Sequence, residues 1–483
     1  MKQWITIILV LLLFAGIVYA EDTPDFKRQV IRVPMSTADW LRPYWKDINE
    51  DGLTDLLALV QRDEKAFIYI QNGSGIPSLP TQSIRFPEGT AWFAVYDVSE
   101  HPGNELLIST TEGLSYYRQN NGIVETKPEK LIEAKQVIPQ NHPPIVKEPD
   151  KWPEDLKNTI PVVFSDHTII YKCDEDYQLT PGKKIEHEFK KSIEKYNWNS
   201  WSIGPKKSDQ LCISITADEE SKDEDEKDST QENEYIQKMI EKIKKDNAWW
   251  TEYDIERQDI DADNDEDLVL WRISGAILDI KTSVMVFLRN ENGKLPEKPS
   301  QILRCQGMPL DVSYRNRHTS VLTDVNNDGL MDILLLDLKT KPLSASSFVE
   351  AVVSKGMEWV LTVRLFKKQK GYQNRADFKM VFTSMLPMAY GASGPVTFDG
   401  DFNADGRKDL IVRRAPTQCD IYLSSSASGF YDRKPKIQLE VPPEGRMFVQ
   451  DLNNDGISDI YLINYEKGEI TVFLSKSLNR KGA

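Results

Sequence analysis

The sequence lacks the short motifs that identify most enzyme families. It contains no GxSxG, HExxH or phosphate-loop sequence, and its five histidines are scattered along the chain: His101, His142, His167, His187 and His318. A catalytic site needs a nucleophile beside a base, or carboxylates that are free to act on a substrate, and no such constellation is visible. Distant segments can still bring carboxylates together, so an enzyme stays open as an alternative.

Cysteine and clustered positive charge are also scarce. The four cysteines are Cys173, Cys212, Cys305 and Cys419, and none forms a CxxC pair that would indicate a metal site. They allow three full pairings, of which Cys173 with Cys212 is the nearest in sequence. Lys and Arg number 60 against 75 Asp and Glu, which gives a net charge of −15 without a basic cluster. This balance argues against a nucleic-acid partner.

Only one long hydrophobic run is present, at the N-terminus. Lys2 precedes an apolar stretch from Trp4 to Tyr19, and Val18-Tyr19-Ala20 forms a small-residue cleavage pattern. Residues 1–20 therefore read as a secretory signal peptide. The run is slightly long for one, so an uncleaved anchor is the alternative. We expect an exported protein, periplasmic, secreted or at the cell surface, without a stable membrane span after signal cleavage.

Acidic loops of one pattern, by contrast, are abundant. DINEDGLTD (47–55) recurs as DIDADNDED (259–267), DVNNDGLMD (324–332), DFNADGRKD (401–409) and DLNNDGISD (451–459). Calcium takes six to eight oxygens, and such a loop offers them at positions 1, 3, 5, 7 (by the backbone carbonyl) and 9. The expected ligands are Asp47, Asn49, Asp51, Leu53 and Asp55; Asp259, Asp261, Asp263, Asp265 and Asp267; Asp324, Asn326, Asp328, Leu330 and Asp332; Asp401, Asn403, Asp405, Arg407 and Asp409; and Asp451, Asn453, Asp455, Ile457 and Asp459.

These loops are not EF-hands. An EF-hand closes with a bidentate Glu at position 12 and is flanked by helices, whereas position 12 here is Ala, Leu or Val. Each loop runs instead into a short apolar segment of the kind that forms a buried strand. Five calcium ions would bring the net charge from −15 to −5. A sixth segment, 97–108, keeps Asp97 but places Ser99 and His101 at ligand positions, which suits a hard cation poorly.

Hairpin patterns repeat between the loops. The segments 67–86, 114–132, 168–185, 286–305, 361–382 and 420–441 each read as strand, Asn/Gly/Ser turn and strand, and 469–481 begins a seventh. The unit is strand, loop, strand and hairpin, which makes a four-stranded antiparallel sheet. Seven such sheets predict an all-β, seven-bladed β-propeller. The last unit lacks a strand, and we expect residues 30–33 to supply it and to close the ring.

The pattern D-x-[DN]-x-[DN]-G-x-x-D-[LI] before an apolar strand resembles the FG-GAP/VCBS repeats. These repeats occur in the propellers of integrin α-chains and in many exported bacterial proteins. The resemblance covers roughly residues 27–479. It implies a seven-bladed propeller whose loops bind calcium as structural ions at one face.

An insertion is expected at residues 187–250, because 162 residues separate the loops that begin at 97 and 259. Residues 216–234 are a polar acidic run that should be disordered. Residues 235–245 have helical periodicity, either for a helix packed on the rim or for one that binds a partner. Four tryptophans bracket the insertion, and they serve either in the core or in stacking on sugars: Trp198, Trp201, Trp249 and Trp250. A second, shorter insertion at 344–359 predicts a short helix.

The sequence favours a non-catalytic, calcium-binding module for a protein or glycan partner. A carbohydrate-active enzyme, hydrolase or lyase, on the same scaffold is the alternative, and a purely structural role is a third. A propeller fold hosts all of these, so the fold does not decide among them.

Overall fold

The computed structural model describes twenty ranges of the chain. They are 25–35, 41–60, 65–87, 90–101, 103–110, 112–120, 122–133, 159–163, 167–174, 177–186, 198–207, 210–217, 251–276, 279–290, 294–309, 322–339, 357–384, 396–424, 430–432 and 434–476. Every regular element in these ranges is a β-strand, and every pair of neighbouring strands is antiparallel. The predicted all-β class is therefore confirmed.

The first half of the chain forms three sheets and two hairpins. The β2–β5 sheet contains β2 (Leu41–Lys46), β3 (Asp55–Val60), β4 (Lys65–Tyr69) and β5 (Gln82–Arg85). The β6–β11 sheet contains β6 (Thr90–Tyr96), β7 (Glu105–Thr110), β8 (Gly113–Tyr117) and β11 (Glu129–Glu133), and β9 (Gln119–Asn120) pairs with β10 (Ile123–Val124). The β12–β14 sheet contains β12 (Thr159–Val163), β13 (His167–Cys173) and β14 (Leu179–Glu186), and β15 (Trp198–Lys207) pairs with β16 (Gln210–Ala217).

The second half forms four sheets, each of four or five strands. The β17–β20 sheet contains β17 (Thr251–Gln258), β18 (Asp267–Ala276), β19 (Asp279–Phe287) and β20 (Gln301–Gln306). In the β21–β25 sheet, β21 (Met308–Pro309) and β22 (Leu322–Thr323) both pair with β23 (Asp332–Leu338), which β24 (Met357–Arg364) and β25 (Phe378–Ser384) follow. The β26–β29 sheet contains β26 (Val396–Gly400), β27 (Asp409–Ala415), β28 (Gln418–Tyr422) and β29 (Ile437–Glu440). The terminal sheet contains β30 (Arg446–Gln450), β31 (Asp459–Asn464), β32 (Glu469–Lys476) and β1 (Asp25–Arg32).

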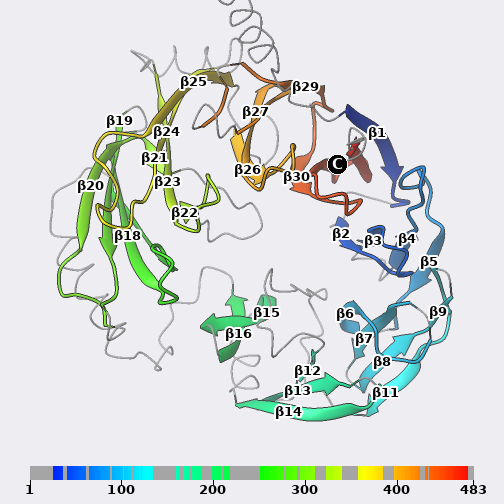
Figure 1. The fold of residues 1–483 in the computed structure, drawn as a ribbon. Coiled ribbons are helices and arrows are strands. Elements are labelled where there is room, and N and C mark those ends of the chain that lie inside the picture. The colour runs from blue at the N-terminus through cyan, green and yellow to red at the C-terminus, as the bar shows by residue number, and fades with distance from the viewer. Residues whose placement is uncertain are drawn as a thin grey trace, which may run out of the picture.

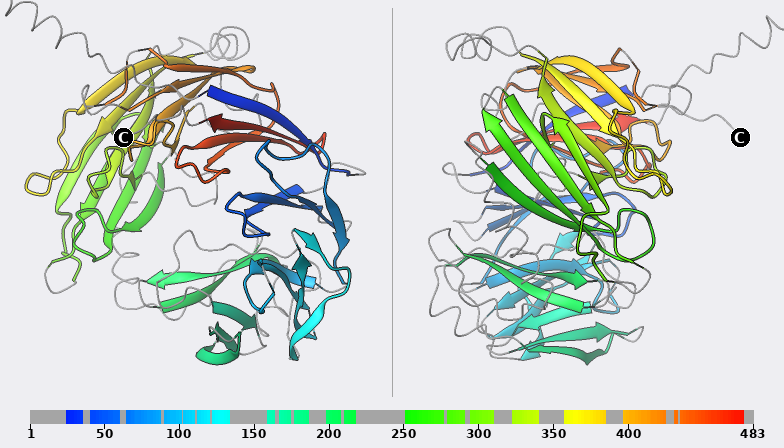
Figure 2. Two further views of the ribbon diagram at one scale, coloured as in Figure 1. Left: turned by 45° about the vertical axis from the view of Figure 1, so that its right-hand side comes forward. Right: turned by 90° about the vertical axis from the view of Figure 1, so that its left-hand side faces the viewer.

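The terminal sheet joins the two ends of the described chain. β1 pairs with β32 without a break, from Asp25 opposite Lys476 to Arg32 opposite Glu469. The N–H of Val33 continues the contact by donating to the carbonyl of Gly468 at 2.8 Å. The prediction that residues 30–33 join the last sheet is confirmed. Figure 1 shows blue β1 at the red end of the chain, with the sheets following one another in chain order around the picture, and Figure 2 gives two further views.

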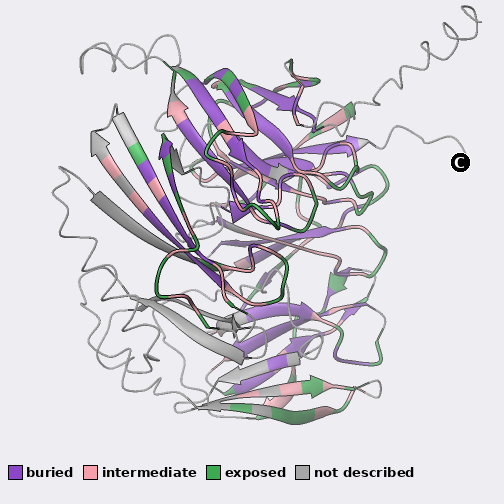
Figure 3. Cartoon of the chain, turned by 60° about the vertical axis from the view of Figure 1, so that its left-hand side comes forward, coloured by how far each residue is buried: buried purple, intermediate pink, exposed green. Residues whose placement is uncertain are grey.

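The second strand of each loop-bearing sheet is buried on both faces. In β3, Leu56, Ala58 and Val60 pack in a cluster with the terminal sheet. The alternate residues Leu57 and Leu59 pack in a second cluster with the β6–β11 sheet. Because successive side chains of a strand point to opposite faces, a strand between two other sheets must be apolar throughout. This explains the unbroken apolar run after each loop. Figure 3 shows that buried residues gather in the strands and exposed residues in the connections between them.

Five such clusters join six sheets in an unbroken series. They link the β6–β11 sheet to the β2–β5 sheet, and that sheet to the terminal sheet. The series continues through the β26–β29 and β21–β25 sheets to the β17–β20 sheet. Trp45 on β2 contacts Tyr461 on β31 edge-on, with ring centroids 5.2 Å apart, so the first complete sheet of the chain packs on the terminal one.

The predicted insertions differ in part from the structure. Within 187–250 the structure places the β15–β16 hairpin, and Thr216 and Ala217 end β16, so the acidic run begins after this strand. The helix predicted at 344–359 does not extend to its end, because Met357 opens β24. The signal peptide at 1–20, the rest of the acidic run, the helix at 235–245, and Trp249 and Trp250 lie outside the described residues.

Candidate metal centre

The five acidic loops occupy the same place in five sheets. Each connects the first strand of a sheet to the second: β2 to β3, β17 to β18, β22 to β23, β26 to β27 and β30 to β31. In each, the aspartate at position 9 is the first residue of the second strand. Each of the five predicted acidic loops is therefore a connection between two paired strands, at the same place in its sheet.

The aspartate at position 9 is a buried clamp between two segments of its sheet. One carboxylate oxygen accepts the N–H of loop position 2, and the other accepts an N–H at or just beyond the end of the third strand. Asp409, for example, accepts from Phe402 and from Ser424, both at 2.6 Å. The equivalent pairs of donors are Ile48 and Gln71 for Asp55, Ile260 and Arg289 for Asp267, Val325 and Phe366 for Asp332, and Leu452 and Ser475 for Asp459.

Burial raises the pKa of every aspartate at position 9, since removal from water disfavours the charged form. The pKa reaches about 6 for Asp55 and Asp267, about 7 for Asp332 and Asp459, and about 8 for Asp409. The backbone donors lower each value and the loop carboxylates raise it, but burial is the largest cause. Burial thus opposes the negative charge of these five carboxyl groups at neutral pH.

Positions 1 and 5 shape the turn. The carboxylate at position 1 accepts the N–H of position 6, as in Gly52 to Asp47 at 2.8 Å. The carboxylate at position 5 accepts the N–H of position 7, as in Leu53 to Asp51 at 2.8 Å. The other four loops repeat both bonds. The carboxylates are therefore oriented by the backbone of the loop itself.

Two residues in each loop adopt the left-handed conformation. Position 6 has φ between 70° and 85°, which glycine takes without steric cost and which Asn264 takes in the second loop. Position 4 also has positive φ although it is never glycine: Glu50, Ala262, Asn327, Ala404 and Asn454 lie between 54° and 60°. The sequence predicts the turn at position 6, but position 4 gives little signal because only its two asparagines favour this conformation.

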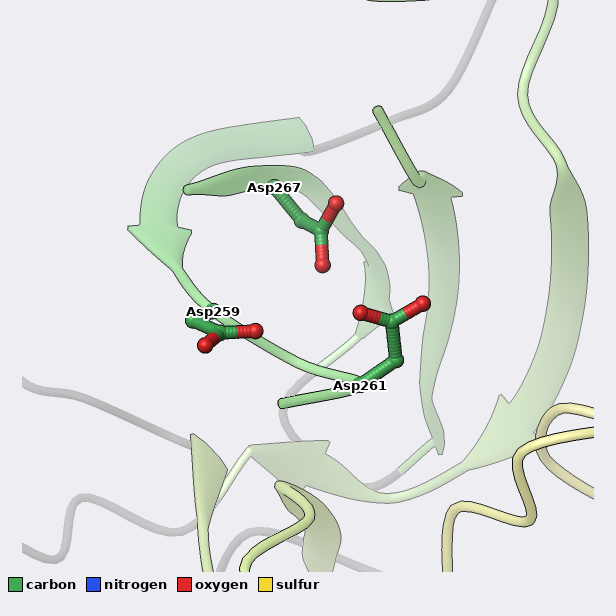
Figure 4. Close-up of side chains that lie close together, drawn as sticks. All are labelled: Asp259, Asp261 and Asp267. Atoms are coloured by element: carbon green, nitrogen blue, oxygen red, sulfur yellow. The ribbon is translucent and has the colours of Figure 1, made fainter. Parts of the chain in front are cut away.

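The loop at 259–267 brings three carboxylates together. Asp259, Asp261 and Asp267 each offer one oxygen, and these oxygens lie within 4.8 Å of one another. Figure 4 shows the three side chains directed at a common region from the two ends of the loop. Desolvation and the charges of Asp263 and Asp259 raise the pKa of Asp261. The other four loops hold Asn at position 3, whose Nδ2–H donates to the carboxylate at position 5.

The donor set fits a hard divalent cation. All side-chain donors in the loops are carboxylate or amide oxygens, the ligands that such cations prefer. Asp261 Oδ1 and Asp47 Oδ1 are buried oxygens without a hydrogen-bond partner. A buried carboxylate oxygen of this kind is costly unless a donor or a cation satisfies it. The residues at position 7 lie within the bend of each loop: Leu53, Asp265, Leu330, Arg407 and Ile457.

The degenerate loop at 97–105 keeps one acidic position that the sequence prediction missed. Glu105, fully buried, occupies position 9 and begins β7. Its carboxylate accepts the N–H of Val98 at 3.0 Å and the hydroxyl of Ser99 at 2.5 Å. Burial raises its pKa. The sequence does place a carboxylate eight residues after Asp97, the spacing of the other loops. It was not recognised because the residue is Glu where the other loops have Asp, and because Ser99 stands at position 3 where they have Asp or Asn.

Neighbouring loops are bonded to one another. The N–H of Asn104 donates to the carbonyl of Ile48 at 3.0 Å, and that of Met331 donates to Ile260 at 3.0 Å. The N–H of Ser458 donates to the carbonyl of Asp401 at 2.8 Å. In each case position 8 of one loop reaches position 1 or 2 of the preceding one, so these loops lie on the same side of their sheets.

Known proteins offer little further guidance. No protein-family model matches the chain, and no curated protein matches it either. A solved lectin from Agrocybe aegerita, described as recognising non-reducing terminal N-acetylglucosamine, shares 9% identity over 89% of this chain and 87% of its own, with a TM-score of 0.31. No family is assigned by this likeness.

Three other predictions concern residues outside the loops. Trp198 and Trp201 lie on β15, where Trp201 is opposite Ile215. Cys173, Cys305 and Cys419 are free thiols, so the Cys173–Cys212 pairing is not formed. No helix in the described part of the chain has the length and hydrophobicity needed to cross a bilayer.

Proposed function

We propose that this chain is an exported, calcium-stabilised β-propeller of seven blades that serves as a non-catalytic binding module for a protein or glycan. Each blade corresponds to one of the sheets with three or more strands, and the β15–β16 hairpin belongs to the insertion. The packing of six sheets in series supports the ring, as does the pairing of β1 with β32. The resemblance to the FG-GAP/VCBS repeats points to the same architecture.

Calcium is the cation that this proposal assigns to the five loops. The carboxylates at positions 1, 5 and 9, the side chain at position 3 and the carbonyl at position 7 would hold it. The bound ion supplies positive charge that offsets the repulsion among the loop carboxylates and the cost of burying position 9. The buried, unpartnered oxygens of Asp261 and Asp47 support this assignment.

One observation carries the non-catalytic role: each acidic residue of the described ranges whose side chain is buried as a whole has partners that hold it in place. The five aspartates at position 9 bind two backbone N–H groups each, and Glu105 binds Val98 and Ser99. Asp420 pairs with Arg414 at 3.2 Å and accepts from Gln438 at 3.0 Å. A general acid or base must be free to exchange a proton with a substrate, whereas these groups hold strands and loops together.

The test uses the purified chain with calcium. We expect binding to a glycan array or to a captured extracytoplasmic partner, and we expect Trp198→Ala and Trp201→Ala to weaken it without altering the melting temperature. Thermal unfolding with and without a chelator tests the metal separately, since a ligand of the native state stabilises it by about 2.7 kcal/mol per site at a hundredfold excess over Kd.

Two results would contradict the proposal. Equal melting temperatures in calcium and in chelator would refute the calcium assignment. Turnover of a glycan or ester, abolished by one carboxylate substitution outside the loops, would replace the binding module by an enzyme.

A further inference from the structure

The last acidic loop of the chain reaches the first through one side chain. The amide Nδ2–H of Asn454 donates to the carbonyl of Gly52 at 2.7 Å, across the contact between the terminal sheet and the β2–β5 sheet. Asn454 is position 4 of its loop and Gly52 is position 6 of the other. Both residues are in the left-handed conformation, at φ of 56° and 85°. The contact therefore joins the turns of two neighbouring loops.

Asn327, at position 4 of the loop at 324, also approaches the next loop, at 401. A Cβ built on Gly406 would lie 2.7 Å from Nδ2 of Asn327, so this amide also rests on position 6 of the next loop. Where position 4 is alanine, the contact is missing. Ala262 stands at this position in the loop before Gly329, and Ala404 in the loop before Gly456, and neither side chain has an amide that could donate. The bridge thus depends on the asparagine side chain and not on the fold alone.

We propose that Asn454 couples cation binding between adjacent loops, so that the loops at 451 and 47 fill cooperatively. The inference rests on the proposed calcium sites and specifies how they are regulated. The loop pairs 259 with 324 and 401 with 451 lack the asparagine bridge and fill more independently.

The coupling follows from where Asn454 sits. It lies between Asn453 and Asp455, two proposed ligands, so an ion in this loop fixes the backbone that carries the Asn454 side chain. That side chain holds the carbonyl of Gly52, whose peptide group continues into Leu53. The N–H of Leu53 is bound by Asp51, and its carbonyl is a proposed ligand. An ion in either loop therefore orders the other, and such linkage is reciprocal.

Terbium(III), a luminescent probe for calcium sites, can report on the loop at 47 separately from the others. Trp45 lies two residues before Asp47, whereas the equivalent positions of the other loops hold Arg257, Leu322, Asp399 and Val449. Because Trp45 also packs on Tyr461 of the terminal sheet, emission is assigned to the loop at 47 when it is lost in Trp45→Phe and kept in Asp455→Ala, which disables the neighbouring loop at 451. We expect Asn454→Ala to raise the terbium midpoint of this signal roughly three- to tenfold, as the loss of one hydrogen bond allows. Alanine fits the backbone here, since Ala262 and Ala404 occupy the same conformation.

Three further variants decide the mechanism. Asp455→Ala, which disables the loop at 451, should raise the same midpoint, and Asn454→Ala should add nothing in that background. Asn327→Ala, the matched control, removes the asparagine at the same position of another loop and should leave the midpoint within twofold. An unchanged midpoint in Asn454→Ala, or an undiminished effect in the Asp455→Ala background, refutes the coupling alone. Absence of any saturable terbium signal from the unmodified chain refutes the proposed metal sites and the coupling with them.

Discussion

Replacing Asp409, in the β26–β29 sheet, by alanine should lower the free energy of unfolding more than the loss of one surface charge would. The carboxylate is fully buried and accepts the N–H groups of Phe402 and Ser424, which join the loop to the end of β28. Alanine leaves both donors buried and without an acceptor. Each unsatisfied donor costs about 1–3 kcal/mol, so we expect a loss of about 2–6 kcal/mol in the free energy of unfolding.

The Asp409→Asn variant distinguishes the stability that comes from the hydrogen-bonded clamp from the stability that comes from the metal. In chelator at pH 7 the pKa of about 8 keeps Asp409 largely protonated, so the substitution by asparagine changes little charge there. Asparagine has the same shape but only one acceptor oxygen, so Asp409→Asn leaves one of the two backbone N–H groups without an acceptor and should cost about 1–3 kcal/mol in chelator. In calcium the variant also loses a charged ligand, and the loss should rise by about 2–3 kcal/mol, the order of the stabilisation by one bound ion.

The assay is urea unfolding followed by tryptophan fluorescence, in calcium and in chelator. Glu440→Ala, at an exposed position of β29, is the matched control and should change the free energy of unfolding by less than about 0.5 kcal/mol. If Asp409→Ala behaves like this control in both conditions, the clamp has no energetic role. If Asp409→Asn is equally destabilising with and without calcium, position 9 is not a ligand.

Two further predictions test the terminal sheet and the buried carboxyls. Deleting residues 25–32 should expose the edge of β32 and cause aggregation detectable by light scattering, whereas deleting 219–233 should leave the melting temperature unchanged; equal tolerance of both would contradict the role of β1. Because the pKa values of Asp332, Asp409 and Asp459 in the folded state exceed that of an unfolded aspartate, the native state binds more protons between about pH 4 and 8, and the metal-free protein should lose stability as pH rises. The gain in melting temperature on adding calcium should accordingly be larger at pH 8 than at pH 6, and the opposite order would refute this reading.

Much of the architecture was predictable because its signals are local. Acidic residues at fixed spacing followed by an apolar run located five loops and their second strands, and the missing strand of the last unit indicated where β1 belongs. The bonds between loops were not predictable, since Asn454 and Gly52 meet only once the sheets are packed. Glu105 was missed because the other loops have Asp at position 9, and the longer Glu side chain makes the equivalent hydrogen bonds although the residue differs from the pattern. The β15–β16 hairpin was missed because it belongs to no repeat.

The pairing of β1 with β32 also sets a condition on how the chain can be made. β1 ends at Arg32 and β32 begins at Glu469, so during synthesis the first strand waits without a partner until the whole segment between them has been made. Pairings between such distant segments form slowly, because the entropy of closing the intervening chain must be overcome before any contact is gained. The terminal sheet should therefore be the last to assemble, and a nascent or truncated chain is left with an unpaired strand at one end and an open sheet edge at the other.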